Sequence, residues 1–426
     1  MAYTDYIDLD YKSYRDDLVT LLYIEPSPES DFETATEAVA GESSIGTWTD
    51  VLTIDPKRLK KITPKIFHLD REKGIIAIAY PLGLFELNNI PQIMSSVAGN
   101  IFGMKIIKNM RLLDIQLPEN VLKAFNGPKF GISGIRKILK VKKRPLVGTI
   151  IKPKLGLNYK EHAKVAYESW IGGCDIVKDD ENLSNQSFNP FKERIKNTLK
   201  MRDAAEKETG EKKIYMPNIT AETGEMTKRA EFVKKQNGEY VMVDVLTVGF
   251  SALQTLINEN LNLVIHAHRA MHAALTRNPK HGISMLALAK LYRLIGMDQL
   301  HIGTVIGKME GSLEEIVLIR DEMIKQKIDE DFSKNHVAQD WKNLKPVFPV
   351  ASGGLHQGHV PKLVEILGND VIIQAGGGIH GHPDGTISGA RAMRQAVDAV
   401  MEGIPLEEYS TNHYELERAL KKFGII

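Results

Sequence analysis

The sequence predicts an α/β protein in which a (β/α)₈ TIM barrel follows a smaller α+β N-terminal domain. From Pro145 onward, short runs rich in β-branched residues alternate with longer amphipathic stretches, the pattern of repeated βα units. Eight such runs occur, which is the number of strands in this barrel. Before about residue 126 that regular alternation is absent, which indicates a separate, smaller domain.

The strands are predicted where short apolar runs lie between helical segments. They are residues 146–152, 174–179, 213–219, 240–246, 261–268, 298–304, 347–352 and 370–376. Segments with helical periodicity separate them, such as 161–173, 191–210, 283–297 and 389–403. We therefore expect an N-terminal domain over residues 1–126 and a barrel over 127–426. Gly and Pro residues around a short basic helix mark the junction at 127–145.

The composition is that of an ordinary globular protein, with 43% hydrophobic and 26% charged residues. The 55 basic and 54 acidic residues nearly balance, so no overall charge favours nucleic acid or a membrane as a partner. Cys174 is the only cysteine, which excludes an internal disulfide and a cysteine-based zinc site. The first residues lack a signal-peptide pattern, and no apolar run approaches the ~18 residues of a membrane span. We expect a cytoplasmic protein.

Seven of the eight predicted strands end in polar residues or glycines, at the edge where such barrels carry their chemistry. The residues are Lys152 and Lys154 after the first strand, Lys178, Asp180 and Glu181 after the second, Asn218 after the third, His268, Arg269 and His272 after the fifth, His301 on the sixth, Ser352, Gly353 and Gly354 after the seventh, and Gly376, Gly377 and Gly378 after the eighth. Any one of these is also typical of an ordinary surface or capping residue. Together they indicate one polar site at the barrel mouth.

Two anion sites are expected at this mouth. The glycines after strands seven and eight suit a phosphate, because backbone N–H groups without side chains approach its oxygens. Lys152 or Lys154 could add positive charge there. Arg269 and His301 could bind a second anion on the other side.

Lys178 stands among acids at the end of an apolar strand. Alternation places Lys178 and Asp180 on one face, and Glu181 follows as the strand ends. Carboxylates suit a hard cation such as Mg²⁺, but a protonated lysine cannot ligate a metal. Lys178 either forms an ion pair with Asp180 or, when neutral, adds carbon dioxide to give a carbamate that supplies a further anionic ligand. By the same alternation Asp179 points away and is assigned no role.

The histidines of IHAHRAMH are a second candidate metal cluster, because H-x-H places two imidazoles on one face of a strand. Zinc amidohydrolases combine H-x-H with a carbamylated lysine in a barrel, but on the first strand and with an aspartate after the eighth. Here the motif lies on the fifth strand and the eighth ends in glycines, which disfavours that interpretation. His380 and His382 are expected in a loop, and Cys174 in the core.

Along nearly its full length, the chain resembles the large subunit of ribulose-1,5-bisphosphate carboxylase/oxygenase (RuBisCO). The similar motifs, in the family's order, are GESSIGTWTDV (41–51), AGNIFGMK (98–105), GTIIKPKLGL (148–157), GGCDIVKDDEN (172–182), HAHRAMHA (266–273), HIGTVIGKMEG (301–311), PVASGGLH (349–356) and QAGGGIHGHP (374–383). The lack of long terminal extensions is most similar to the archaeal type called form III.

The resemblance implies a role for each matching position. Lys178 would be carbamylated, would bind Mg²⁺ with Asp180 and Glu181, and would remove the carbon-3 proton. Lys152 would protonate the final carbanion, supported by Lys154, and His268 would be the base for hydration. The remaining implied contacts are a phosphate site at Arg269 and His301, another at Thr47, Trp48, Gly354, Gly376 and Gly377, sugar contacts at Ser352 and the adjacent Gly353, a lid residue Lys308 paired with Glu42, and Asn100 near the metal.

The implied reaction is carboxylation of D-ribulose 1,5-bisphosphate to 3-phosphoglycerate through a magnesium-stabilised enediolate. Oxygen would compete with carbon dioxide, and the form III resemblance suggests a place in AMP or nucleotide salvage. In the family the small domain completes the site of a partner chain, so we expect a homodimer or a multiple of dimers without small subunits. The chain departs from plant members at Ile150, where they have threonine, and in its short C-terminal tail.

Two other functions compete with this one. A RuBisCO-like enolase or isomerase would act on a related sugar phosphate without fixing carbon dioxide, but such proteins typically replace the lid lysine. This chain retains Lys308, Glu42, Lys152 and His268. A non-catalytic binding or scaffold protein that had lost its activity would be expected to have lost some of the polar residues at the strand ends. This chain retains them.

Overall fold

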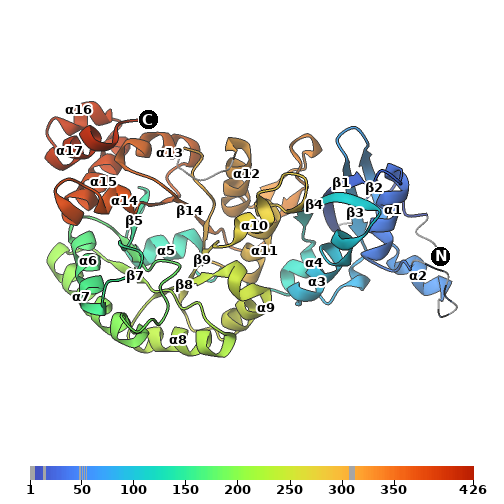
Figure 1. Cartoon of the computed structure of the whole chain (residues 1–426), viewed down its shortest axis with the longest axis horizontal. Coiled ribbons are helices and arrows are strands. Elements are labelled where there is room, and N and C mark those ends of the chain that lie inside the picture. The colour runs from blue at the N-terminus through green and yellow to red at the C-terminus, as the bar shows by residue number, and fades with distance from the viewer. Residues whose placement is uncertain are drawn as a thin grey trace. The chain divides into compact units, whose positions relative to one another are not determined.

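The structure is a computed structural model that describes residues 5–12, 16–47, 49, 51, 53, 55–306 and 312–426. The chain divides into two compact units, each described here by itself. Unit 1 contains Met1–Gly127 with two later segments, Met271–Ile295 and Lys325–Leu344. Unit 2 contains Pro128–Ala270, Gly296–Ile324 and Lys345–Ile426. Figure 1 labels the elements of both units.

Unit 1 is built on a five-stranded sheet with the order β10-β4-β1-β3-β2. Its strands are β1 (Leu18–Pro26), β2 (Lys65–Asp70), β3 (Ile75–Tyr80), β4 (Ile107–Gln116) and β10 (Gly282–Ile283). The central strand β1 pairs antiparallel with β3 and β4, whereas β10 adds to β4 in parallel. All six residues of β3, which lies between β1 and β2, are buried, as in a strand that is covered on both faces.

Helices accompany this sheet, as expected for an α+β domain. They are α1 (Phe32–Glu42), α2 (Pro56–Ile62), α3 (Ile90–Val97), α4 (Glu119–Lys123), α10 (His272–Thr276) and α11 (Met285–Ile295), with short 3₁₀ turns η1 (Leu82–Leu84), η2 (Asn100–Gly103) and η3 (Phe332–Lys334) and the ribbon β12 (Lys327–Ile328) and β13 (Gln339–Asp340). Helix α1 begins after Asp31, whose side chain accepts from the backbone N–H of Thr34 at 2.8 Å. Helix α11 is wholly buried and is tied to β4 by Lys290 Nζ, 2.7 Å from Asp114 Oδ1.

Unit 2 contains an eight-stranded sheet in which each named pair of neighbouring strands is parallel. Its order is β7-β6-β5-β15-β14-β11-β9-β8. The strands are β5 (Leu146–Ile150), β6 (Ile176–Lys178), β7 (Ile214–Met216), β8 (Tyr240–Asp244), β9 (Val264–His268), β11 (Gln299–His301), β14 (Phe348–Ser352) and β15 (Ile372–Gln374). Met242 N donates to Pro217 O at 2.8 Å, which joins the two ends of the sheet. The eight predicted strands and the barrel are confirmed.

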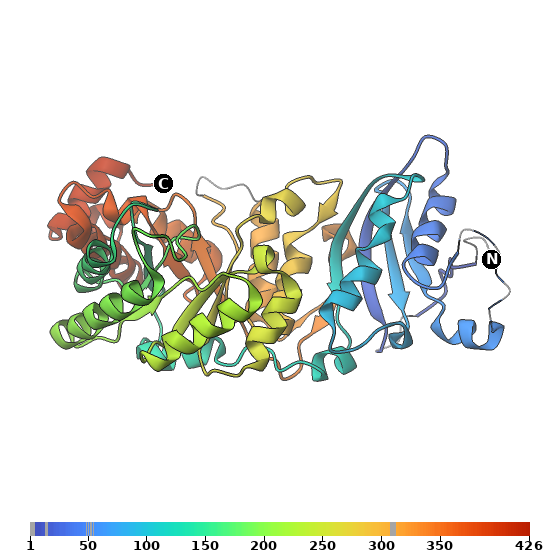
Figure 2. The ribbon, with the colours of Figure 1, turned by 60° about the horizontal axis from the view of Figure 1, so that its bottom comes forward.

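The helices of unit 2 lie outside its strands (Figure 2). They are α6 (Tyr159–Ile171), α7 (Phe191–Thr209), α8 (Thr223–Lys235), α9 (Val245–Asn258), α12 (Leu313–Ile324), α13 (Val360–Leu367), α14 (Gly377–His380), α15 (Gly385–Glu402), α16 (Leu406–Ser410) and α17 (Tyr414–Phe423), with the 3₁₀ turn η4 (Gln357–His359). Asn158 and Glu161 form a capping box at the start of α6, which fixes where the chain turns from the first strand loop into a helix.

Helix α5 (Gly131–Leu139), predicted as the short basic helix of the junction, covers the N-terminal ends of the strands. Its apolar residues Ile132, Ile135 and Leu139 share one buried cluster with the first residues of the strands. Those residues are Leu146, Ile176, Ile214, Tyr240, Val264, Phe348 and Ile372. The apolar bottom of the barrel is therefore closed, and the opposite ends of the strands are left for polar residues. In the described part of the chain, no helix is long and apolar enough to cross a membrane.

Candidate active site

Lys178 is the last residue of β6, at the carboxyl end of the strand, and only 1% of its surface is exposed. Its Nζ donates to the backbone oxygen of Asp179 at 2.8 Å and lies 3.2 Å from Met242 Sδ. Burial lowers the pKa of Lys178, although the charges of Glu181 and Asp180 act in the opposite direction. The neutral amine, which is the form that reacts with carbon dioxide, is therefore more accessible here than on a solvated lysine.

The neighbouring carboxylates pair with two other lysines. Asp180, buried to the same degree as Lys178, has its Oδ2 2.9 Å from Lys152 Nζ. Glu181 Oε1 lies 2.9 Å from Lys154 Nζ. Burial raises the pKa of Glu181, but the hydrogen bond from Lys154 and the charge of Lys178 outweigh it and lower that pKa to about 2. Each carboxylate is thus paired with a lysine that follows the first strand, and Glu181 is held ionised.

These side chains fit a magnesium site in their chemistry. In the described part of the chain, no three His, Cys, Asp or Glu residues gather as a metal site. Asp180 and Glu181 supply two carboxylates, and Mg²⁺ prefers oxygen ligands. A carbamate on Lys178 would add further anionic oxygens beside them. The donor set therefore suits Mg²⁺ when Lys178 is carbamylated.

Asp179 faces the opposite way, as alternation along the strand predicts. Its carboxylate contacts His162 Nε2 and Arg194 Nε, both at 3.0 Å, and accepts from the Tyr215 hydroxyl at 2.7 Å. Burial raises the pKa of Asp179, but Arg194 and His162 outweigh it and lower that pKa to about 2. Asp179 is thus the centre of a buried ionic cluster that anchors the end of β6 to α6 and α7.

His268, at the end of β9, faces both an acid and the carboxylate pair. Its Nδ1 lies 2.6 Å from Asp244 Oδ1 at the end of β8, and its Nε2 lies 3.9 Å from Glu181 Oε2. A carboxylate at Nδ1 holds a proton on that nitrogen and leaves Nε2 free as an acceptor. This arrangement suits His268 to act as a base toward the barrel mouth.

His266 and His301 form a second pair beneath His268. Their Nε2 atoms are 2.8 Å apart, and His266 Nδ1 lies 2.9 Å from Gln299 Oε1. Burial lowers the pKa of both rings well below the usual range. The charge of Lys178 lowers the pKa of His266 further, and the neighbouring His266 lowers that of His301. Both imidazoles are therefore neutral at physiological pH and share one proton between their Nε2 atoms.

Arg269 follows β9 and is half-buried. Loss of hydration lowers its pKa to about 10, so it remains a cation at neutral pH. Gly303 makes room for it, because a Cβ at that position would lie 3.2 Å from Arg269 Nη2. Gly303 also has a φ of +107°, a conformation that favours glycine.

The glycines after β14 and β15 leave open backbone at the same end of the barrel. Gly353 and Gly354, which follow Ser352, have φ values of +129° and +77°. Gly376 lies against Lys152, and a Cβ there would be 3.0 Å from Lys152 Cε. Gly377 begins α14, with nothing within 4 Å of a Cβ built on it. Glycine backbone and Lys152 thus lie at the same end of the barrel.

Comparisons with known proteins identify the family. The family described as "Ribulose bisphosphate carboxylase large chain, catalytic domain" matches residues 131–423, and the corresponding N-terminal domain family matches residues 5–121. A protein of Methanocaldococcus jannaschii named ribulose bisphosphate carboxylase is 54% identical over 424 residues, covering 98% of this chain and 99% of that protein. The chain belongs to the RuBisCO large-chain family.

Solved structures agree with this assignment. The octameric RuBisCO of Pyrococcus horikoshii, solved with sulfate, is 48% identical with a TM-score of 0.93 and covers 100% of this chain and 97% of its own. The dimeric archaeal RuBisCO of Hyperthermus butylicus is 44% identical with a TM-score of 0.94 and full coverage of both chains. The chain is therefore an enzyme of a carboxylase family, as its motifs predict.

Other residues expected from the RuBisCO resemblance lie in unit 1 or outside the described residues. Glu42 is the last residue of α1, and Asn100 begins η2 with an exposed side chain. The Thr47 hydroxyl donates to the backbone oxygen of Thr49. Trp48 and Lys308 are outside the described residues.

The remaining polar residues predicted at the strand ends have structural partners. Asn218 donates from Nδ2 to the backbone oxygen of Glu181 at 3.0 Å, so it supports the loop that carries this acid. His272 begins α10 in unit 1. His380 ends the short helix α14 rather than lying in a loop, and its Nε2 lies 3.0 Å from Thr149 Oγ1. Cys174 is fully buried, as predicted.

Asp244 and Gln299 are absent from the residues that the sequence predicts for the RuBisCO site. The predicted fourth strand extends to residue 246, which places Asp244 inside the strand, whereas β8 ends at Asp244. One signal could have identified Asp244. The strand at 240–246 is the only predicted strand without a polar end, and Asp244 is an acid close to that end. Gln299 carries no such signal, since it begins β11 and matters only because His266 of β9 lies beside it.

Proposed function

We propose that this chain carboxylates D-ribulose 1,5-bisphosphate to 3-phosphoglycerate, with oxygen as a competing substrate. The observation that carries the proposal is Lys178, a buried lysine at the end of β6 beside Asp180 and Glu181. Relatives covering nearly the full chain bear the name ribulose bisphosphate carboxylase. A buried amine next to two carboxylates is the arrangement that a carbamate-dependent magnesium site needs.

The carbamylated Lys178, Asp180 and Glu181 would hold Mg²⁺. When bound, Mg²⁺ would offset the negative charge of the enediolate formed from the sugar. A carbamate oxygen of Lys178 would remove the carbon-3 proton. Lys152 Nζ, now 2.9 Å from Asp180, would deliver a proton to the carbanion that remains after carbon–carbon cleavage, and Lys154 would add positive charge beside it.

His268 would serve as the base that takes a proton from the hydrating water. Asp244 would keep the proton on His268 Nδ1, which leaves Nε2 to act. His266 and His301 are neutral, so no imidazolium charge on these two rings would oppose the uptake of a proton by His268.

Two phosphate sites would fix the two ends of the substrate, so that the carbon-3 proton lies over the base. Arg269 and His301 would bind one phosphate. The backbone of Gly354, Gly376 and Gly377 would bind the other, and Ser352 and Gly353 would contact the sugar.

We propose that the N-terminal domain, residues 1–126, completes the active site of a partner chain in a homodimer or a multiple of dimers without small subunits. Thr47 and Trp48 would then join the glycine phosphate site, Asn100 would lie near the metal, and Glu42 would pair with the lid residue Lys308. The dimeric and octameric assemblies of the similar archaeal structures support this proposal.

Mixed dimers test the shared site. Chains carrying Lys178→Ala and chains carrying Glu42→Gln should each be inactive alone. Co-expressed, they should regain roughly a quarter of wild-type activity, since random pairing leaves one intact site in half of the dimers. If the mixture stays inactive while light scattering shows dimers, each chain carries its own complete site.

The carboxylation assay tests the reaction itself. Protein preincubated with bicarbonate and Mg²⁺ should convert ribulose 1,5-bisphosphate and labelled carbon dioxide to labelled 3-phosphoglycerate, and oxygen should reduce the label. Lys178→Ala should abolish the product, whereas the exposed Lys160→Ala should not. Consumption of substrate without label in the product would favour a RuBisCO-like enolase or isomerase and contradict the proposal.

We further propose that the reaction serves AMP or nucleotide salvage in the cytoplasm, which rests on the form III resemblance. Extracts of the source cells given AMP, phosphate and labelled bicarbonate should form labelled 3-phosphoglycerate. Disruption of this gene should remove the label. Persistence of the label after disruption would contradict the salvage role and leave the carboxylation assay unaffected.

A further inference from the structure

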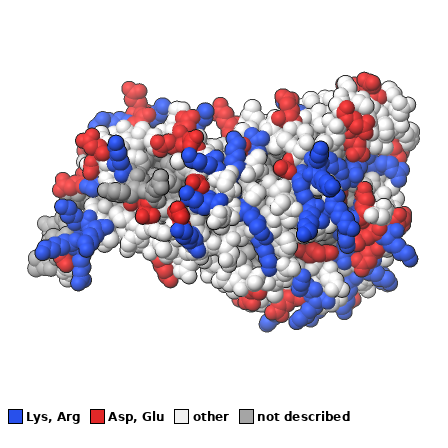
Figure 3. Space-filling view, turned by 180° about the vertical axis from the view of Figure 1, so that it is seen from behind, with Lys and Arg blue, Asp and Glu red and all other residues white. Residues whose placement is uncertain are grey.

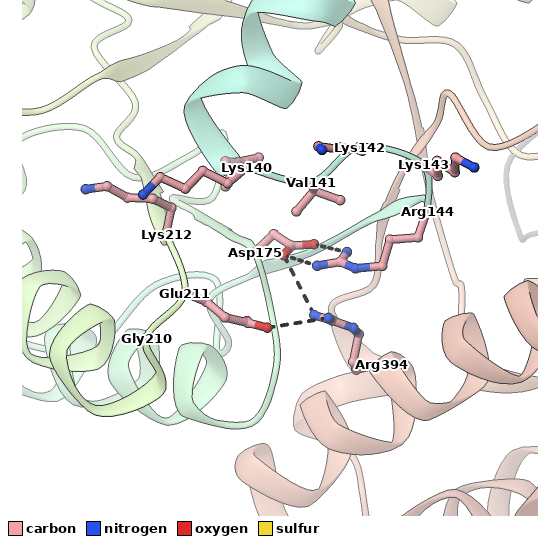
Figure 4. A pocket seen from close by; sticks show the side chains of 11 residues that line it. Lys140, Val141, Lys142, Lys143, Arg144, Asp175, Gly210, Glu211, Lys212 and Arg394 are labelled. Carbon is pink, nitrogen blue, oxygen red and sulfur yellow. Dashed lines mark hydrogen bonds and ion pairs between the residues drawn. The ribbon is translucent and has the colours of Figure 1, made fainter.

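A recess opens at the N-terminal ends of the barrel strands, beside helix α5 (Figure 4). Its volume is about 390 Å³. It is lined by the loop that joins α5 to β5 (139–144), by Asp175 just before β6, by the turn 210–212 between α7 and β7, and by Arg394 of α15. Because Asp175 precedes β6 and Lys178 ends it, this recess and the candidate active site lie at opposite ends of the same strand.

The lining of the recess is strongly basic. Its cations are Lys140, Lys142, Lys143, Arg144, Lys212 and Arg394, and its acids are Asp175 and Glu211. Clefts lined by charge of one sign concentrate the field and attract ions of the opposite sign. This local excess contrasts with the chain as a whole, in which 55 basic and 54 acidic residues nearly balance.

The two acids are already engaged. Asp175 accepts two hydrogen bonds of 2.7 Å from Arg144 and one of 2.8 Å from the backbone N–H of Val147. Glu211 lies 2.8 Å from Lys213 Nζ and 3.5 Å from Arg394. Figure 4 shows both arginines directed at Asp175 on the floor of the recess. The acids therefore do not neutralise the lysines of the rim.

Of the four lysines of the recess, Lys212 lies 2.8 Å from Oε2 of Glu206, and the other three form the rim. Lys140, Lys142 and Lys143 are exposed, and no ion pair joins them to an acid in the described part of the chain. Lys140 has a φ of +58°, so the helix ends there in a left-handed turn and the next residues follow the edge of the recess. The guanidinium groups below are shielded, with only 13% of the Arg144 side chain and 22% of the Arg394 side chain exposed. Both guanidinium groups contact Asp175, so the exposed lysines of the rim carry the excess positive charge.

We propose that this recess binds a small anion that carries two or more linked phosphate groups. Lysine and arginine donors on several sides suit the many oxygens of such a group, and a single monovalent anion would leave most of them unmatched. The volume is in the range of small-molecule sites. On the rear face of the molecule, acidic side chains lie between the basic clusters (Figure 3).

Inorganic pyrophosphate is the probe. Calorimetric titration of the full-length protein at low ionic strength should show binding that added NaCl weakens. Lys142→Glu with Lys143→Glu should weaken it by about tenfold or more. The control pair Lys137→Glu with Lys160→Glu changes the charge equally at exposed positions outside the recess and should bind within about twofold of wild type.

A further variant separates this site from the proposed substrate phosphate site. Arg269→Ala should leave the pyrophosphate binding that depends on Lys142 and Lys143 intact. Circular dichroism melting curves establish that all variants are folded, and the milder Lys142→Gln with Lys143→Gln replaces the double glutamate if it is not. Equal binding by the recess and control variants, or loss of all binding in Arg269→Ala, would overturn the proposal.

Discussion

Lys152 Nζ lies 2.9 Å from Oδ2 of Asp180, so a lysine just after the first barrel strand pairs with an acid just after the second. Asp180 is buried, whereas 29% of the Lys152 side chain is exposed. The RuBisCO resemblance assigns Lys152 to the protonation step. In this structure Lys152 is paired with Asp180, a carboxylate that would have to bind the proposed metal. If the proposed Mg²⁺ binds Asp180, it would release Lys152 toward substrate, so the proposed site predicts that the two events are coupled.

Lys152→Met should separate these two effects. Freeing Asp180 should preserve or increase the Mg²⁺-dependent retention of labelled carbon dioxide on Lys178, measured by trapping the activated protein. Carboxylation should fall by about 100-fold or more, because the proton donor is lost. The exposed Lys160→Met should change neither quantity, and loss of carbon dioxide retention in Lys152→Met would contradict the coupling.

Asp244→Asn should impair the base without disturbing the activation site. The amide no longer favours a proton on His268 Nδ1, so the wrong tautomer is populated and turnover should fall by about tenfold to a hundredfold. Carbon dioxide retention by Lys178 should persist. Asp370→Asn, which alters a half-exposed acid paired with Arg136, is the control. Unchanged turnover in Asp244→Asn would remove Asp244 from the site.

Gln299 should control substrate affinity through two histidines. Gln299 Oε1 accepts from His266 Nδ1, so a neutral His266 accepts at Nε2 from His301 Nε2, and this chain of hydrogen bonds holds both rings in place. Gln299→Leu removes that acceptor at similar size, which frees the orientation of His301. The KM for ribulose bisphosphate should rise by about tenfold with a smaller change in kcat. A loss of kcat at unchanged KM would contradict the relay.

Stability should depend on pH through the same pair of histidines. Burial lowers the pKa of His266 and His301 in the folded state, so below about pH 6.5 the unfolded chain binds more protons than the folded one. The free energy of unfolding should therefore fall as the pH drops from about 7 to 5. Urea denaturation should show a shallower fall for His266→Asn. An equal slope in that variant would exclude His266 as a source.

Asp179→Asn should destabilise the fold rather than remove a ligand. It leaves Arg194, whose side chain is 0% exposed, without its carboxylate partner. Removing one partner of a buried pair costs about 3–5 kcal/mol, measured here by urea denaturation. Asp203→Asn, at a largely exposed acid, should cost far less. Adding Arg194→Met to Asp179→Asn should recover part of the loss, and no recovery would contradict the pairing.

Much of the site was predictable because it follows local patterns. Alternation along 174–179 separates Asp179 from Lys178 and Asp180, and parallel strands bring their carboxyl ends to one edge. His268, Arg269 and the glycines after β14 and β15 were found in this way. The partners of His268, His266 and Asp179 could not be predicted in this way. They are Asp244, Gln299 and Arg194, which reach these residues from other strands and helices.

The sequence by itself determined the barrel, the end of it that is polar, and the family, since apolar periodicity and motif spacing are properties of the chain. Only the tertiary structure decided that Asp180 pairs with Lys152, and that Lys178 instead contacts a carbonyl and Met242. It alone also assembled the basic recess below the barrel, from segments as distant as 140–144 and Arg394. The reason is physical: pairing among charges depends on distances between side chains that the fold alone brings together.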